Sequence, residues 1–387
     1  MTISSYEMMR HWLFDKALPF WLVHGVDRNE GGFVEQLSLD GSNAHVDFKR
    51  VRVVARQIYV FSHAALLGVP ETQPAADHGF EFLTRNAWLG DAAGWARALN
   101  RAGTVIDPTP DLYDLAFVLY ALGWYHRATK KPEALMWAHR TRQFIDTHMR
   151  HPSGGFQHQR PCDLPLQQNP HMHLLEAALV VFEATGDKAF KSLADEIVTL
   201  FLTRLYDGTS RTLVEFYDEN WRRFGETERQ LVEPGHLYEW AWILSTYRRL
   251  TQAQVDGPIR GLIDFAETYG LDRVSGSVIN AVNVAGLPLD AGCRVWPNTE
   301  RIQAAVAAFE VFGDDPRPIF DAAVPVIFRL FLDPAPRGTW IDRRTQDGTI
   351  AVASIPASTL YHIMIAAAEM LRIETAVERT LGPSRLH

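Results

Sequence analysis

A unit of about sixty residues recurs six times along this chain. Each copy places an apolar anchor in or beside a short turn or strand pair, as in Gly31-Gly32-Phe33 and Gly154-Gly155-Phe156. The anchors lie 62, 61, 57, 65 and 62 positions apart, and they are Phe33, Trp95, Phe156, Leu213, Val278 and Trp340. One such unit cannot bury its own apolar face, so the copies must pack against one another. The repeat therefore restricts the chain to a stacked or closed array.

Each unit reads as a turn followed by two helices. Residues 174–184 and 302–312 show the apolar spacing of a helix, and Thr185-Gly186-Asp187 stops one helix before a second segment at 188–205. The unit is too long for tetratricopeptide or HEAT repeats, and the terminal copies carry the full pattern where an open solenoid needs polar caps. The sequence predicts an all-α fold, an (α/α)6 barrel with short β-hairpins at the active-site end, as a single catalytic domain over residues 1–387.

The starts of the predicted inner helices carry unusual side chains. In a closed ring the hairpins lead into these helix N-termini, where partial positive charge suits oxygen-rich ligands. The side chains at these places are Arg56, Asp114, Asn169, His171, His173, His236, Glu239, Trp296, Glu300 and His362. Ordinary helix starts would be Ser, Thr, Asp or Asn caps. Imidazoles, a guanidinium, carboxylates and an indole directed at one axis predict a pocket.

One of these helix starts, the segment 233–240, places a titratable pair together. Pro234 and Gly235 precede an apolar periodicity that begins near His236, so a helix is expected to start there. His236 and Glu239 are three residues apart and share one face of the first turn, where the carboxylate can orient the imidazole. Such a pair can perform acid–base chemistry on a hydroxylated substrate. Taken alone, the segment also fits a helix start with a half-exposed histidine.

At these residues the sequence resembles the N-acylglucosamine 2-epimerase superfamily, and within it the bacterial D-mannose isomerases. The similar segments follow in matching order over almost the whole chain: 21–35, 50–61, 169–176, 233–240, 296–300 and 361–362. The residues Pro356-Ala-Ser-Thr-Leu-Tyr-His362 look like the mannose isomerases. The Arg that usually follows Pro-Tyr-His in cellobiose 2-epimerases is absent. Animal-type acylglucosamine epimerases lack a histidine at the position of His173.

The resemblance implies a metal-independent aldose–ketose isomerase that interconverts D-mannose and D-fructose, or D-lyxose and D-xylulose. The implied reaction is ring opening followed by histidine-mediated C2–C1 proton transfer through a cis-enediolate. Imidazole can move a proton in either direction near neutral pH, and arginine can stabilise the enediolate because it stays charged. The implied catalytic set is Arg56, His173, His236, Glu239 and His362.

Each member of this set has an expected role. His362 is expected to shuttle the proton between C2 and C1, while His236, oriented by Glu239, opens the ring. Arg56 is expected to stabilise the enediolate, and His173 to hold a hydroxyl or O1. The predicted substrate-binding residues are Asn169, Trp296, Asp114, Glu300, Gln303 and His171. Asn169 and Gln303 fit sugar hydrogen-bonding and helix-capping roles equally.

Three alternatives stay open. A sugar 2-epimerase of the mannose/glucose, cellobiose or N-acylglucosamine type would use the same residues, with His236 protonating C2 from the opposite face. A glycoside hydrolase would need two carboxylates across the scissile bond, and Asp114, Glu233, Glu239 and Glu300 supply candidates. A helical binding scaffold would not require several inward histidines. His171-x-His173 could suggest a metal site, but helical residues two apart point to different sides. We expect no metal and no cofactor.

Composition excludes several partners. The net charge of −8 without a basic cluster disfavours nucleic acid. The two cysteines, Cys162 and Cys293, cannot build a disulfide framework. The first twenty residues lack a charged-then-apolar signal pattern, and no apolar run has the length of a membrane span. We expect a cytoplasmic enzyme with a monosaccharide substrate and no membrane partner, and the sequence leaves a homo-oligomer open. One pocket arginine and no glycine-rich phosphate loop argue against a phosphorylated substrate.

Overall fold

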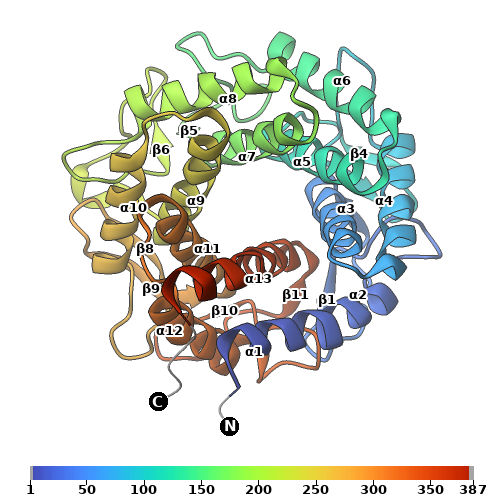
Figure 1. Ribbon diagram of the computed structural model, residues 1–387. Helices are drawn as coiled ribbons and strands as arrows, with labels where there is room; N and C mark the ends of the chain where they lie inside the picture. The colour runs from blue at the N-terminus through green and yellow to red at the C-terminus, as the bar shows by residue number, and fades with distance from the viewer. Residues whose placement is uncertain (1–2, 383–387) are drawn as a thin grey trace.

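Two concentric layers of helices form the protein, as the computed structural model of residues 3–382 shows (Figure 1). The inner helices are α3 (Val51–Leu66), α5 (Leu112–Thr129), α7 (Asn169–Thr185), α9 (Pro234–Thr251), α11 (Val295–Phe312) and α13 (Leu360–Leu381). Each inner helix contacts the next, and α13 also contacts α3. The inner layer is therefore a closed ring.

The outer layer covers this ring. It consists of α1 (Ser5–Trp12), α2 (Leu18–His24), α4 (Gln73–Asn86), α6 (Pro132–His148), α8 (Lys188–Leu200), α10 (Asp256–Tyr269) and α12 (Arg317–Ile327). The first helix of the chain, α1, contacts α12 and α13 near the end of the chain, so the two ends of the chain meet. This mostly helical arrangement is consistent with the predicted (α/α)6 barrel.

Burial explains the different sequence patterns of the two layers. Inner helices such as α5 and α7 are apolar nearly all round because neighbours cover every side. The outer helix α8 has one apolar stripe, formed by Phe190, Leu193 and Ile197. Gly186 ends α7 with a φ of 72°, a left-handed conformation that glycine adopts without steric cost.

Short strands connect the units at one end of the ring. The strands are β1 (Gln36–Ser38), β2 (Phe48–Arg50), β3 (Ala98–Asn100), β4 (Val105–Asp107), β5 (Leu166–Gln167), β6 (Phe216–Tyr217), β7 (Leu231–Val232), β8 (Ile279–Asn283), β9 (Pro288–Arg294), β10 (Arg343–Arg344) and β11 (Ser354–Pro356). All pairs are antiparallel, and the sheet orders are β1-β11, β2-β3-β4, β5-β6 and β10-β9-β8-β7.

These pairings correct the expectation of one strand pair within each unit. Within their own units, β3 pairs with β4 and β8 with β9, whereas other pairs join different units and β1 with β11 joins the two ends of the chain. Strands of two or three residues are marginal alone, and the ring brings a neighbouring edge within reach. The anchors lie in tight turns after the outer helices, as the bridges Val26–Phe33 and Trp88–Trp95 show.

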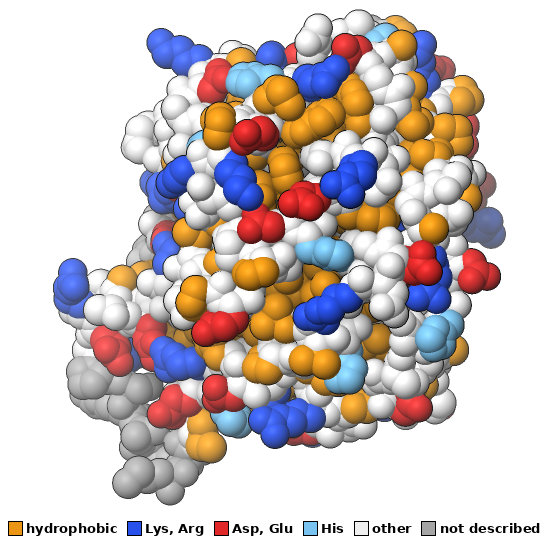
Figure 2. All heavy atoms as spheres, turned by 90° about the vertical axis from the view of Figure 1, so that its right-hand side faces the viewer, with side chains coloured by type: hydrophobic (Ala, Val, Ile, Leu, Met, Phe, Trp, Pro, Cys, Tyr) orange, Lys and Arg blue, Asp and Glu red, His pale blue; other side chains and the backbone are white. Residues whose placement is uncertain are grey.

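The outer surface is mixed in character. Figure 2 shows acidic, basic and hydrophobic side chains interspersed over one face. Among the helices that the structure describes, none is long and apolar enough to span a bilayer.

Candidate active site

A cavity of about 360 Å³ opens at the end of the ring where the inner helices begin. It has the size of a small-ligand site. Its lining consists of Arg50, Arg56, Tyr113, Asn169, His173, Glu233, His236, Glu239, Arg294, Trp296, Asp342, Pro356, Ser358, Thr359 and His362. Seven predicted site residues are among them: Arg56, Asn169, His173, His236, Glu239, Trp296 and His362.

Two imidazoles flank one indole in this cavity. The ring centroid of Trp296 lies 5.0 Å from that of His236 and 5.4 Å from that of His362, with interplanar angles of 35° in both pairs. The three side chains come from α9, α11 and α13, which are consecutive in the ring. The Trp296 indole therefore lies between the two imidazoles, and all three side chains line the same cavity.

Glu215 orients His236, which corrects the prediction that Glu239 does so. His236 Nδ1 is 2.9 Å from Glu215 Oε1, and the other Glu215 oxygen accepts a 2.9 Å hydrogen bond from Gln168 Nε2. Gln168 is fixed in turn by the indole N–H of Trp240, at 2.6 Å. Glu239 lies one helical turn further along α9, and its nearest imidazole is that of His173.

His362 is held by Glu300. Its Nδ1 is 2.7 Å from Glu300 Oε1, and Gln303 donates to Glu300 Oε2 at 2.5 Å. Both partners come from α11 and are buried. Nδ1 is thereby occupied, and Nε2 is the ring nitrogen left for chemistry in the cavity.

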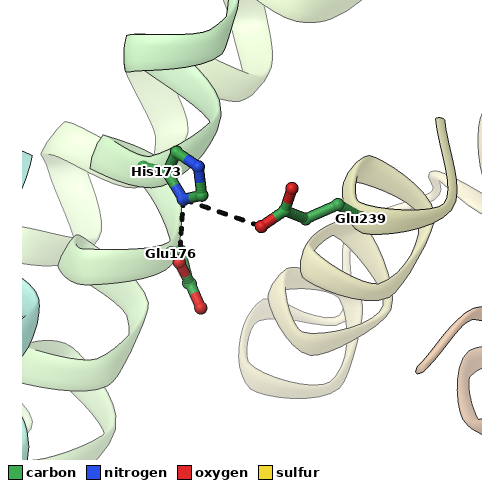
Figure 3. A group of neighbouring side chains, drawn as sticks. All are labelled: His173, Glu176 and Glu239. Atoms are coloured by element: carbon green, nitrogen blue, oxygen red, sulfur yellow. Dashed lines mark hydrogen bonds and ion pairs between the residues drawn. The ribbon is translucent and has the colours of Figure 1, made fainter. Parts of the chain in front are cut away.

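His173 lies between two carboxyl groups (Figure 3). Its Nδ1 is 3.2 Å from Glu176 Oε2 and 3.7 Å from Glu239 Oε1. Glu176 also accepts hydrogen bonds of 2.7 Å from the Tyr361 hydroxyl. Neither oxygen of Glu239 has a hydrogen-bond partner within residues 3–382. A buried, unpaired carboxyl group that lines the cavity is a ready partner for a ligand hydroxyl.

Arg56 contributes the positive charge of the site. Its guanidinium donates to the Tyr113 hydroxyl at 2.6 Å and lies 4.0 Å from the Phe117 ring centroid. Tyr361 is a second aromatic neighbour, at 4.9 Å. Packing against aromatic rings fixes the planar group while leaving its charge uncompensated by any carboxylate in the described ion pairs.

The two flanking histidines have opposite pKa shifts. Burial acts to lower the pKa of His236, but the carboxylates of Glu215 and Glu233 outweigh burial and raise it to about 9. Burial and the positive charge of Arg56 lower the pKa of His362 well below 6.5. At neutral pH, His236 is therefore an imidazolium acid and His362 a neutral base. Groups whose surroundings separate their pKa values in this way divide the acid and base roles.

Four predicted binding residues do not line the cavity. Glu300 and Gln303 lie behind His362. Asp114 is buried and accepts a hydrogen bond from the Arg52 backbone N–H at 3.0 Å, so it caps the start of α3 from the neighbouring helix. His171 accepts a 3.0 Å hydrogen bond from the Phe156 N–H in a hairpin, and burial lowers its pKa to about 4. His171 and His173 thus point to different sides, which removes their predicted alternative as a joint metal site.

A signal for Glu215 was present in the repeat. The residue two positions after an anchor repeatedly contacts the start of an inner helix: Glu35 with Arg50, Arg97 with Asp111, Glu215 with His236, Asn280 with Arg294 and Asp342 with Thr359. The anchor is buried in the core, and its neighbour two residues on meets the next helix N-terminus. Aligning the six units at this position would have found the partner of His236.

Two sets of donor atoms could hold a cation. His173, Glu176 and Glu239 form one set, and Glu239, Glu300 and His362 the other, with ligand atoms within 4.8 Å in each. Burial raises the pKa of Glu176 to about 8 and that of Glu239 to about 7. At neutral pH much of this carboxyl population holds protons that a cation would have to displace. The expected absence of a metal requirement stays a prediction.

The buried carboxyl group of Glu176 predicts a pH-dependent stability. The pKa of Glu176 is about 8 in the folded protein, against about 4.5 in the unfolded chain. The protonated carboxyl group therefore contributes its full stabilisation below pH 4.5, and this contribution is lost as the pH rises through 8. Between these values the free energy of unfolding of the wild type should fall more steeply than that of Glu176→Gln, by about 1.4 kcal/mol per pH unit. Urea denaturation at pH 5 to 8 measures this difference. Glu226→Gln, an exposed substitution, should match the wild type; equal slopes for all three proteins would contradict the prediction.

A cavity with one histidine of raised pKa, one histidine of lowered pKa and an arginine has the groups that a proton-transferring enzyme requires. Sequence comparison narrows this class. The chain belongs to the N-acylglucosamine 2-epimerase (GlcNAc 2-epimerase) family, whose profile matches residues 31–366. It is thus an enzyme of the isomerase class, as the resemblance predicted.

Individual relatives carry different names. A "Mannose-6-phosphate isomerase" of Rhizobium meliloti (strain 1021) is 36% identical over 375 residues, which are 93% of this chain and 95% of the relative. A "Cellobiose 2-epimerase" of Bacteroides fragilis is 25% identical over 334 residues, 81% and 83% of the two chains. A crystal structure of a D-mannose isomerase superposes with a TM-score of 0.85 at 22% identity and covers 94% of this chain and 97% of its own, which shows the shared fold.

Proposed function

We propose that this enzyme interconverts D-mannose and D-fructose. The observation that carries the proposal is the pair of oppositely shifted histidines, His236 and His362, on either side of Trp296. Aldose–ketose isomerisation needs an acid for ring opening, a base at C2 and a positive charge at the developing oxyanion. His236, His362 and Arg56 supply these three in one cavity.

The reaction follows from the charge states. The His236 imidazolium donates a proton to the ring oxygen as the bond from C1 to that oxygen breaks. Neutral His173 accepts the proton of the O1 hydroxyl, which leaves the C1 carbonyl. Neutral His362 then removes the C2 proton through Nε2, and the electron pair moves toward O1 to give an enediolate. Arg56 stabilises this charge, since its described hydrogen-bond partners are the Tyr113 hydroxyl and the Ser358 carbonyl and no carboxylate among residues 3–382 is paired with it. His362 returns the proton to C1, and transfer of the O2 proton to O1 completes the ketose.

The alternative product is the C2 epimer. The same enediolate gives an epimer when a proton reaches C2 from the face opposite to His362. His236 lies across Trp296 from His362 and could supply that proton. The cellobiose 2-epimerase among the relatives supports keeping this second candidate.

Incubation with D-mannose in D2O tests both candidates. With chelator-treated enzyme, NMR should show fructose as the first product, formed at the rate of untreated enzyme. Deuterium should appear at its C1 in those turnovers in which protonated His362 exchanges with D2O before it returns the proton. Glucose as the first product would replace isomerase by 2-epimerase. Activity that disappears with the chelator and returns with a divalent cation would show a metal requirement, for which the two buried donor sets are the candidate sites.

The name of the 36% identical relative raises a second question, namely whether the substrate of this enzyme is a phosphorylated sugar. The prediction of a single pocket arginine was wrong, since Arg50, Arg56 and Arg294 all line the cavity. Arg50 is paired with Glu35 at 2.5 Å and Arg294 with Glu233 at 2.8 Å. Both pairs already compensate their arginines, so a phosphate would have to compete with two carboxylates. We therefore propose the unphosphorylated sugar.

We expect kcat/KM for D-mannose to exceed that for D-mannose 6-phosphate by at least about tenfold, a difference of about 1.4 kcal/mol in transition-state binding. Initial rates of ketose formation with each substrate measure the ratio. The variant Glu233→Gln should narrow the ratio because it frees Arg294 for the phosphate. A wild-type preference for the phosphorylated sugar would overturn this assignment while leaving the proton chemistry intact.

A further inference from the structure

A second cavity, of about 470 Å³, lies at the opposite end of the ring. It is formed by the C-terminal halves of inner helices, and we call it the rear cavity. Its lining comes from α3, α5, α7, α9 and α13 and combines arginines and glutamates with leucine, isoleucine and aromatic side chains. Glu176 lines the rear cavity and also contacts His173, which lines the catalytic cavity. The two cavities therefore lie back to back.

The rear cavity has unpaired hydrogen-bond donors. The indole N–H of Trp124 and the hydroxyl of Tyr120 are buried and have no partner among residues 3–382. Trp124 is 9% exposed and Tyr120 only 1%. Buried polar groups in folded proteins are normally paired. The two groups lie beside each other, and Tyr120 also lies near Tyr59 and Glu176, so each has a polar neighbour without a hydrogen bond of normal length. An acceptor bound in the cavity could take either donor.

Cations outnumber ionised acids around this cavity. Four basic side chains line it, namely Arg127, Lys130, Arg249 and Arg372. Glu183 is shared between two of them, at 3.0 Å from Arg127 and 2.7 Å from Arg249. Glu369 accepts from Arg372 at 2.7 Å. Glu176, the third acid of the lining, keeps its proton at neutral pH because burial raises its pKa to about 8. Arg372 also pairs with Glu310 at 2.7 Å, so four basic side chains face three ionised acids. The sharing of Glu183 by two arginines leaves this small excess of positive charge, which favours an anion.

Most of the remaining lining is apolar. Leu66, the last residue of α3, is 47% exposed, and Leu67, which follows it, is 40% exposed. Leu179, Ile243 and Ile365 continue the apolar wall inside. We propose that the rear cavity is a second binding site, separate from catalysis, for a small organic anion that joins an aromatic or aliphatic body to one acidic group. The acidic group would meet the arginines and the unpaired donors while the body covers the leucines.

Benzoate is the probe for this site, with benzyl alcohol as its uncharged counterpart. Saturation-transfer NMR on the full-length enzyme, without sugar, should show benzoate binding that is at least about fivefold tighter than that of benzyl alcohol. Arg127→Gln should weaken benzoate binding about fivefold. Arg140→Gln, which removes a similar charge from the outer helix α6 and lies outside the cavity, should not.

The catalytic cavity needs its own control because it also contains arginines. Arg56→Gln should leave benzoate binding unchanged, since Arg56 lies in the other cavity. No saturation transfer to benzoate, equal binding of benzyl alcohol, or loss of binding in Arg56→Gln would each overturn the proposal. These outcomes are independent of which sugar the enzyme converts, because the measurement uses neither substrate nor turnover.

Discussion

Replacing His362 by Asn should slow exchange of the C2 proton of D-mannose by about a thousandfold. General base catalysis by a positioned side chain contributes roughly 10²- to 10⁴-fold, and an amide cannot accept the proton. His362, the proposed base, is neutral at physiological pH because burial and Arg56 lower its pKa well below 6.5. Deuterium incorporation at C2 and C1, followed by NMR in D2O, measures the exchange directly.

A histidine-to-asparagine substitution outside the cavity distinguishes an effect on catalysis from an effect on folding. His78→Asn removes a half-buried histidine of the outer helix α4, whose ring contacts the backbone oxygen of Asp27 at 3.1 Å. This variant should retain proton exchange. Circular dichroism must show that both variants are folded. Undiminished exchange in His362→Asn would exclude His362 as the base and would redirect the role to His173.

Glu215→Gln should move the alkaline limb of the pH–rate profile to lower pH. In the wild type, kcat/KM should fall as pH rises through about 9, where the His236 acid loses its proton. Removing the carboxylate removes the interaction that favours the imidazolium, so the pKa of His236 must fall. If it returns to about 6.5, the protonated fraction at pH 8 drops about thirtyfold, and kcat/KM at pH 8 drops with it.

Glu35→Gln is the matched control for this experiment. Glu35 and Glu215 follow their anchors by two residues in different units, but Glu35 pairs with Arg50 rather than with a histidine. Its substitution can change the rate but should leave the alkaline limb near pH 9. An alkaline limb that stays near 9 in Glu215→Gln would mean that another carboxylate, with Glu233 at 3.9 Å as the nearest candidate, sets the charge of His236.

The two pKa shifts bear on the choice between isomerase and epimerase. Isomerisation needs one group to move a proton from C2 to C1 on the same face, whereas epimerisation needs a second group to protonate the opposite face. Because His236 stays protonated through most of the neutral pH range, it is able to protonate C2 from the opposite face. The ratio of ketose to C2 epimer should therefore depend on the distance between His236 and C2 of the bound sugar. The packing of His236 against Trp296 sets that distance.

The sequence by itself determined the repeat, the approximate starts of the inner helices and seven of the residues that line the cavity. It could do so because a sixty-residue period places equivalent residues at equivalent points of a ring. His236, His362 and Arg56 lie in the first two turns of inner helices. The apolar pattern marks where these helices begin, so an unusual side chain there can be recognised before its partner is known.

Only the tertiary structure decided which carboxyl group meets which histidine. Glu239 follows His236 by three residues and so shares its helix face, yet His236 is hydrogen-bonded to Glu215, which lies 21 residues away along the chain. Glu300 was predicted to touch the sugar and instead holds His362 across 62 positions. A side chain three residues along a helix is a neighbour by periodicity alone, whereas contacts between helices depend on crossing geometry and burial. Those contacts set the opposite pKa shifts of His236 and His362, and with them the division between acid and base.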